Sequence, residues 1–134
     1  MPIKKQLFKS GPYSDFFSQG VKTGNVLTLA GQLGDDSEGN TPNELKSQME
    51  NCYKNIEIIL EEFGASLDNL IDETWFVTSM EECMSNVSEV FGLREEIFGC
   101  KPEVSQTLVE VSNLVDPKYK ICLLYTSPSP RDGR

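Results

Sequence analysis

The chain of 134 residues has the length and composition of one compact domain, with 38% hydrophobic and 25% charged residues. Its formal net charge is −9, and Arg94 is the only arginine before Ile121, so it lacks the clustered cations that a phosphate backbone requires. No apolar run approaches the roughly 20 residues of a membrane span, and the absence of His excludes a His-based triad and the commonest metal sites. We therefore expect no nucleic-acid partner, no membrane span, no metal and no other cofactor.

The cysteines and the amino terminus indicate a cytoplasmic protein with reduced thiols. Cys52, Cys83, Cys100 and Cys122 form no Cys-x-x-Cys pair, and residues 1–6 lack the apolar core of a signal peptide. We expect Cys52 and Cys83 to pack as small hydrophobic side chains.

Three strands are predicted in the first part of the chain. They cover residues 6–8, 17–21 and 26–30, and residues 23–25 (Thr-Gly-Asn) form the turn between the second and the third. The oxygen-rich stretch 35–40 that follows lacks the complete calcium-binding loop with its terminal Glu, which favours a solvated turn.

Two helices are predicted next, separated by a strand at residues 71–78. The first begins at residues 41–44 (Thr-Pro-Asn-Glu), which have the form of a capping box, and ends at Gly64. The second begins at a similar pattern at residues 79–82 and ends at Gly99. The apolar side chains of the first helix recur on one face, as expected for a helix that covers a sheet. These side chains are Leu45, Met49, Cys52, Ile56, Ile59, Leu60 and Phe63.

A further strand is predicted over residues 102–111, and it places polar side chains on both of its faces. Period-two alternation puts Ser105 and Thr107 on one face and Gln106 and Glu110 on the other. The pattern favours a surface or subunit-contact role for Glu110 over a catalytic one. No base stands beside either hydroxyl, so a nucleophilic role for them is unsupported.

Five segments within residues 8–121 follow one another in a characteristic order. They are residues 17–25, residues 26–32, Asn55 with Leu60 and residues 64–65, residues 74–78, and residues 102–111 with Leu114 and residues 119–121. Together they resemble the Rid family, the reactive intermediate deaminases also called YjgF. The resemblance implies an α+β, chorismate-mutase-like fold, a mixed β-sheet with two helices packed on one face. It also implies a homotrimer with small-molecule pockets between subunits.

The resemblance assigns the pocket to Phe17 and the backbone of Gly31 in one subunit and to Gln106 and Thr107 in its neighbour. In the deaminases, the position of Gln106 is an Arg that binds the substrate carboxylate, and that of Phe17 is a Tyr, whose hydroxyl the nearby Tyr13 is placed to replace. Hydrogen bonds of a neutral amide contribute about 0.5–1.5 kcal/mol, against about 1.5–3 for charged ones. We therefore expect carboxylates to bind at least roughly tenfold more weakly than in the deaminases. No catalytic residue is assigned.

The segment after Ile121 departs from the resemblance. The deaminases carry a Glu, assigned to the activation of water, where this chain has Cys122, and residues 122–132 look like the translation of a sequencing-library adapter. We predict a Rid-like domain at residues 1–121 and a non-native tail at residues 122–134. The alternative is a natural tail rich in Pro and Ser.

Two functions remain open at this point. The first is the hydrolysis of small reactive enamines or imines to a ketone and ammonia, with Gln106 in place of Arg arguing against carboxylate-bearing substrates. The second is that of a non-deaminase Rid paralogue that binds a neutral or amide-bearing metabolite at the trimer interface. Gln106 offers both a donor and an acceptor to such a ligand.

Overall fold

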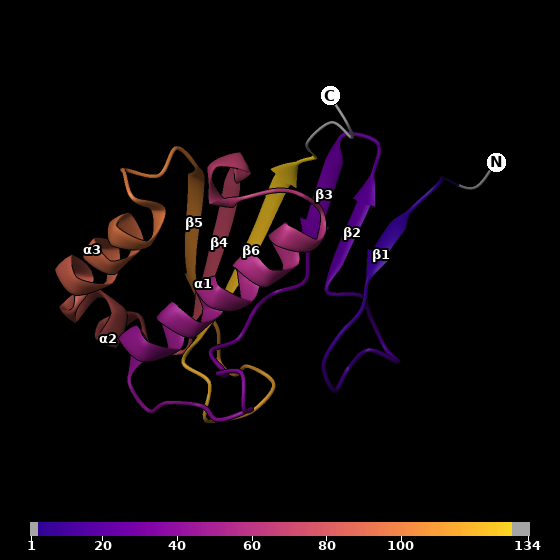
Figure 1. Ribbon diagram of the computed structural model, residues 1–134. Coiled ribbons are helices and arrows are strands. Elements are labelled where there is room, and N and C mark those ends of the chain that lie inside the picture. Colours follow the sequence, from indigo (N-terminus) through magenta and orange to yellow (C-terminus); the bar gives the residue numbers. More distant parts are fainter. Residues whose placement is uncertain (1–2, 130–134) are drawn as a thin grey trace.

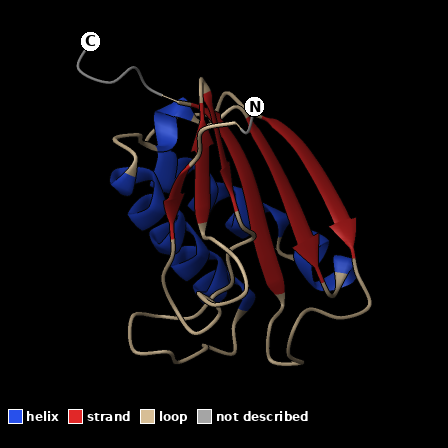
Figure 2. Cartoon of the chain, turned by 90° about the vertical axis from the view of Figure 1, so that its right-hand side faces the viewer, coloured by secondary structure: helices blue, strands red, loops and turns tan. Residues whose placement is uncertain are grey.

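The computed structural model describes residues 3–129, which form one six-stranded mixed sheet with helices on one face (Figures 1 and 2). The strand order is β1-β2-β3-β6-β4-β5, in which only β4 and β5 run parallel and the other neighbours are antiparallel. The strands are β1 Gln6–Phe8, β2 Gly20–Thr23, β3 Val26–Leu29, β4 Asp72–Val77, β5 Ser105–Glu110 and β6 Ile121–Pro128. The predicted α+β fold is confirmed.

Three α-helices cover the sheet where two were predicted. They are α1 Leu45–Glu62, α2 Met80–Ser85 and α3 Val87–Phe98, with a short 3-10 turn η1 at Leu67–Asn69. The predicted second helix divides at Asn86, whose side-chain amide donates to the carbonyl of Glu82 at 2.8 Å. Such local side-chain bonds compete with the helical pattern, which explains the break. No helix within residues 3–129 has the length and apolar character needed to cross a bilayer.

The two predicted helix caps have different outcomes. At α2 the cap is present, since Ser79 Oγ accepts a hydrogen bond from the backbone N–H of Glu82 at 3.1 Å. At α1 it is absent, and the residue before Leu45 makes no side-chain cap. The hydroxyl of Thr41 donates instead to Asp35 in the preceding loop. A hydrogen bond within the preceding loop has thus taken the place of the cap at α1.

The core lies between α1 and the covered face of the sheet. All seven residues of the predicted apolar face of α1 are buried, and they include Cys52. Cys83 is also buried, and all four cysteines are free, as predicted. The sheet contributes Leu27, Leu29, Trp75, Val77, Ile121 and Leu123.

Strand β6 occupies the centre of the sheet, between β3 and β4 (Figure 1). It pairs along the whole of β4, from Val77 opposite Ile121 to Asp72 opposite Thr126. The predicted domain boundary therefore falls at the first residue of this strand, and residues 122–128 of the predicted tail form the rest of it. Residues 130–134 lie outside the described residues. The origin of the tail remains a prediction.

The other face of the sheet carries no helix among the described residues (Figure 2). Because successive side chains of a strand point to opposite faces, burial of Trp75 and Val77 under the helices turns Thr74 and Phe76 to this open face. Leu7 of β1 is 52% exposed there. The open face is thus partly apolar.

Candidate functional site

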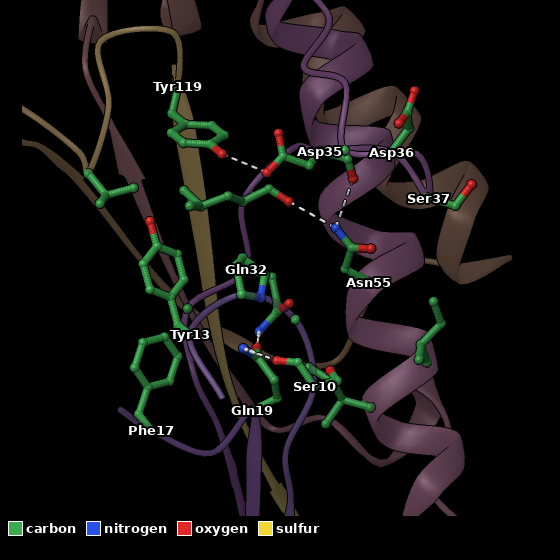
Figure 3. Close-up of a pocket in the computed structure, with 18 of the residues that line it drawn as sticks. Ser10, Tyr13, Phe17, Gln19, Gln32, Asp35, Asp36, Ser37, Asn55 and Tyr119 are labelled. Atoms are coloured by element: carbon green, nitrogen blue, oxygen red, sulfur yellow. Dashed lines mark hydrogen bonds between the residues drawn. The ribbon is translucent and has the colours of Figure 1, made fainter. Parts of the chain in front are cut away.

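A pocket of about 760 Å³ lies where the chain leaves β1 and β3 and enters β6, against one face of α1 (Figure 3). Such a volume suits a small metabolite. The rings that line it are those of Phe8, Tyr13, Phe17 and Tyr119. Its polar side chains include the amides of Gln19, Gln32 and Asn55 and the carboxylates of Asp35 and Asp36. The pocket is thus aromatic and acidic.

Asp35 is a half-buried carboxylate at the pocket wall. The Tyr119 hydroxyl donates to its Oδ2 at 2.6 Å, and the Thr41 hydroxyl donates to its Oδ1. Asn55 of α1 fixes the same loop, since its Nδ2 donates to the backbone carbonyls of Leu33 and Asp35, each at 3.1 Å. Two hydroxyl donors and an anchored backbone therefore hold the carboxylate in place. Figure 3 shows the hydrogen bonds made by Tyr119 and Asn55.

The hydroxyl of Tyr119 acts as a donor in this site. Burial of the side chain, followed by its hydrogen bond to Asp35, raises the pKa of Tyr119 to about 12. The phenol therefore keeps its proton at neutral pH and gives it to the carboxylate as a hydrogen bond. Lys118 lies beside it, with Nζ 5.3 Å from the centroid of the Tyr119 ring.

An amide cluster forms the floor of the pocket. Gln32 is only 8% exposed, and its Nε2 donates to Gln19 Oε1 at 2.8 Å and to the carbonyl of Ala30 at 2.9 Å. The backbone of Gln32 pairs in both directions with Leu123 of β6. Both amide protons of Gln32 are therefore occupied, and its side chain is rigidly placed.

Two of the predicted site residues line this pocket. Phe17 stacks on Tyr13 with ring centroids 5.8 Å apart and planes inclined by 16°, and both residues line the pocket. Gly31 contributes its backbone, and a Cβ there would lie 2.6 Å from Cys122 Sγ. A larger residue at position 31 would therefore require the Cys122 side chain to shift.

The other two predicted residues lie elsewhere in the chain. Gln106 and Thr107 are on β5, at the edge of the sheet opposite β1, and neither lines the pocket. Thr107 is exposed and stands opposite Thr74 of β4. One chain does not bring the four predicted residues together, and their meeting across a subunit boundary remains a prediction.

The side chain of Gln106 turns under the helices. Its Nε2 donates to Oε2 of Glu73 at 2.6 Å, and Glu73 is fully buried. Arg94 of α3 pairs with the same Glu73 oxygen at 2.8 Å, and the hydroxyl of Tyr125 donates to the other. Burial, aided by the nearby Tyr53 and Glu73, raises the pKa of Tyr125 well above its usual value. Gln106 is thus part of a buried network.

Glu110, the other polar residue on that face of β5, has a structural role. Its Oε1 accepts a hydrogen bond from the backbone N–H of Met80 at 2.8 Å. Met80 is the first residue of α2, so the carboxylate satisfies a free donor at the helix start and complements the helix dipole. The noncatalytic interpretation of Glu110 is thereby supported.

The loop at residues 35–40 is a turn, as predicted. Asp36 Oδ1 accepts from the backbone N–H groups of Glu38 and Asn40, each at 2.9 Å. Within residues 3–129, no three His, Cys, Asp or Glu side chains come together to hold a metal ion. Sequence reasoning missed Asp35 inside this loop, because its partner Tyr119 lies 84 residues further along.

Comparison with known proteins decides the family. A family model described as endoribonuclease L-PSP matches residues 9–122. The chain belongs to this family, also called Rid or YjgF. The predicted resemblance is confirmed, and the family match covers the pocket except Phe8 and the Glu73 network except Tyr125.

The sequences of relatives in this Rid family align with most of the chain. A RutC family protein of Pyrococcus abyssi is 34% identical over 106 residues, or 78% of this chain and 76% of the relative. The RutC family protein YjgH of Escherichia coli is 25% identical over 132 residues, covering 96% and 98%. Because the second alignment covers 96% of the chain, it includes part of the predicted tail, residues 122–134.

Solved structures of the family share the fold. The structure of YjgH matches with a TM-score of 0.78 at 22% identity, covering 94% of this chain and 96% of that one. A Rid-family protein of unknown function from Yersinia pestis also gives 0.78 at 22% identity, covering 93% and 99%. The Rid fold of this chain is therefore established, whatever the origin of the residues after Ile121 in strand β6.

Proposed function

We propose that this Rid-family protein hydrolyses small reactive enamines or imines to a carbonyl compound and ammonia in the pocket around Asp35. The family resemblance implies this chemistry. The observation that carries the proposal is the half-buried carboxylate of Asp35, held by Tyr119 and Thr41 in an otherwise aromatic and amide-lined pocket. It is the proton-handling group that the sequence pattern lacked.

The reaction needs only water and proton transfer. An enamine first tautomerises to its imine. Water then adds to the imine carbon, so that a C–O bond forms and the electron pair of the C=N bond moves to nitrogen, which takes up a proton. The C–N bond breaks, ammonia leaves, and loss of the hydroxyl proton gives the carbonyl. In our proposal Asp35 takes the proton of the attacking water and returns it to the leaving nitrogen, as a general base and then acid.

The test compares a carboxylate of the pocket with one outside it in the same loop. Asp35→Asn removes the proton acceptor with little change of shape, and we expect the rate of carbonyl release from a freshly prepared small imine to fall by about 10²–10⁴. Glu38→Gln is the matched control, because it removes the same charge from an exposed residue of the same turn that does not line the pocket. Equal rates for Asp35→Asn and the unchanged protein would exclude Asp35 as the proton carrier.

We also propose a homotrimer, with Gln106 and Thr107 of one subunit near the pocket of the next. The partly apolar open face supports this, because such a face is normally buried against another layer. Light scattering coupled to gel filtration measures the mass directly. A monomer at micromolar concentration would contradict the trimer and leave the hydrolytic proposal, which uses residues of one chain, intact.

A second candidate is the binding of a neutral, amide-bearing metabolite without turnover. It is favoured by Gln19, whose Nε2 makes only a 3.5 Å contact to the carbonyl of Ser10, and by the acceptor oxygen of Gln32. These amides replace Gln106 in that role, because Gln106 is engaged by Glu73. Saturable binding of a small amide without ammonia release from any imine would favour this candidate.

We propose a small molecule rather than RNA as the ligand, in the cytoplasm. Among the described residues that line the pocket there are two carboxylates and one lysine, Lys118, so the phosphodiester backbone of RNA would be repelled. Four free thiols fit a reducing compartment.

A further inference from the structure

The charges of the pocket are unsuited to an acidic ligand. Asp35 and Asp36 line it, and Lys118 is the one basic side chain among the described lining residues. Lys118 is exposed and makes no ion pair with Asp35, whose oxygens accept from two neutral hydroxyls. A half-buried carboxylate without a paired cation repels an anion and attracts a cation more strongly than it would in water.

The rings of the pocket add a second attraction for cations. Tyr13 and Phe17 are 41% and 45% exposed, so part of this stacked pair is open to a ligand. Figure 3 shows these rings and Tyr119 along one side of the pocket, with Asp35 and Gln32 toward its middle. The faces of aromatic rings carry partial negative charge and attract ammonium groups.

The protein supplies its own example of this preference. The ammonium of Lys118 lies 5.3 Å from the centroid of the Tyr119 ring, within the range of a cation–π contact. This lysine is on the exposed loop before β6, so a ligand approaches the same ring in competition with it. The ring next to Asp35 therefore already accepts an ammonium group.

We infer that the pocket selects small organic cations, ammonium or iminium compounds with an apolar body, over carboxylates, with Asp35 as the counter-ion and the rings of Tyr13, Phe17 and Tyr119 as its walls. The inference rests on the proposed function and names its substrate class: imines derived from simple amines, in the protonated iminium form. Lys118 limits the affinity of such ligands by like-charge repulsion.

Three probes of similar shape test this without any reaction. Benzylammonium, benzyl alcohol and phenylacetate carry a positive charge, no charge and a negative charge, and none has a C=N bond. Titration of the full chain, followed by ligand-observed and protein NMR, should give the tightest binding for benzylammonium and the weakest for phenylacetate. Phenylacetate binding as tightly as benzylammonium would overturn the inference.

Two variants locate the preference. Asp35→Asn should weaken benzylammonium roughly tenfold and leave benzyl alcohol within about twofold. The control is Glu38→Gln, which removes a charge from an exposed residue of the same turn outside the pocket lining and should change each affinity less than threefold. Lys118→Met keeps the apolar stem and removes the competing charge, so benzylammonium should bind a few-fold more tightly and phenylacetate more weakly. Unchanged benzylammonium affinity in Asp35→Asn, or weaker benzylammonium binding in Lys118→Met, would overturn the assignment. The exposed Lys118 keeps the test available if Asp35→Asn does not fold.

The outcomes separate this inference from the hydrolytic proposal. A preference for benzylammonium with no carbonyl release from any imine would contradict hydrolysis alone. Carbonyl release accompanied by a preference for phenylacetate would contradict the cation preference alone.

Discussion

Two carboxylates in this protein have similar hydrogen-bond partners but differ in burial and in charge compensation. Asp35 and Glu73 each accept a hydrogen bond from a tyrosine hydroxyl, of Tyr119 and Tyr125 respectively. Glu73 is fully buried and is neutralised by Arg94, whereas Asp35 is half-buried, has no paired cation within residues 3–129, and opens into a pocket. A buried, compensated carboxylate serves the fold, while an uncompensated one at a cavity is free to serve a ligand.

The largest expected effect comes from breaking the buried pair. Glu73→Gln leaves the Arg94 guanidinium buried without its counter-charge, so we expect a loss of about 3–5 kcal/mol of unfolding free energy. Urea denaturation followed by far-UV circular dichroism measures it. The double variant Glu73→Gln with Arg94→Met should recover part of the loss, since no unpaired charge remains. Additive losses would mean that the pair is not coupled.

In contrast to Glu73→Gln, Asp35→Asn should affect activity much more than stability. Its carboxylate is half exposed and its two partners are neutral hydroxyls that an amide can still engage, so we expect at most about 1.5 kcal/mol of destabilisation. Imine hydrolysis should fall by at least about a hundredfold. The same urea titration and the carbonyl-release assay, made on one preparation, give both numbers. A loss of stability as large as that of Glu73→Gln would remove the distinction between the two carboxylates.

Gln106→Arg should alter ligand binding only slightly. The side chain at position 106 faces Glu73, so an introduced guanidinium would compete with Arg94 for that carboxylate instead of reaching a ligand. We expect phenylacetate affinity to change less than about threefold. A tenfold gain, the amount expected for a charged hydrogen bond to the ligand, would show that this position faces a site in the assembled protein.

The smallest expected effect is on the free energy of unfolding at alkaline pH. The pKa of Tyr119 is raised from about 10 in the unfolded chain to about 12 in the folded protein. The stabilisation that the protonated phenol gives to the folded state is therefore complete below pH 10 and is lost as the pH rises through 12. Tyr119→Phe should therefore make the decline of stability between pH 10 and 12 shallower. Urea midpoints at pH 8, 10 and 11 test this, and an identical decline in both proteins would contradict it.

Local sequence patterns predicted much of the fold. The apolar face of α1 and the alternation on β5 each follow from one repeating period, and the structure places their side chains as expected. The capping box predicted at Thr41 is absent because the Thr41 hydroxyl donates to Asp35, which lies in the same loop but outside the four-residue motif. Secondary structure set by nearby residues is thus readable from the sequence, and its exceptions here arise from competing side-chain hydrogen bonds, of Thr41 to Asp35 and of Asn86 to Glu82.

The candidate site was less predictable, because its contacts join residues that lie far apart in the sequence. The signal for the buried network was present, since Glu73 alternates in phase with Trp75 and Val77, and Arg94 falls on the apolar side of its helix. No local period marks Asp35, because its environment depends on Tyr119 far along the chain. Phe17 and Gly31 were found only through the family resemblance.

The central position of β6 has a consequence for biosynthesis. The other five strands are translated before it, yet β3 and β4 can pair with it only once residues 121–128 have emerged from the ribosome. Until then the nascent chain exposes two unpaired strand edges, the kind of surface that promotes misassociation. Ribosomes stalled before codon 121 should therefore carry chains that chaperones retain, and release of the last strand should be the step that frees them.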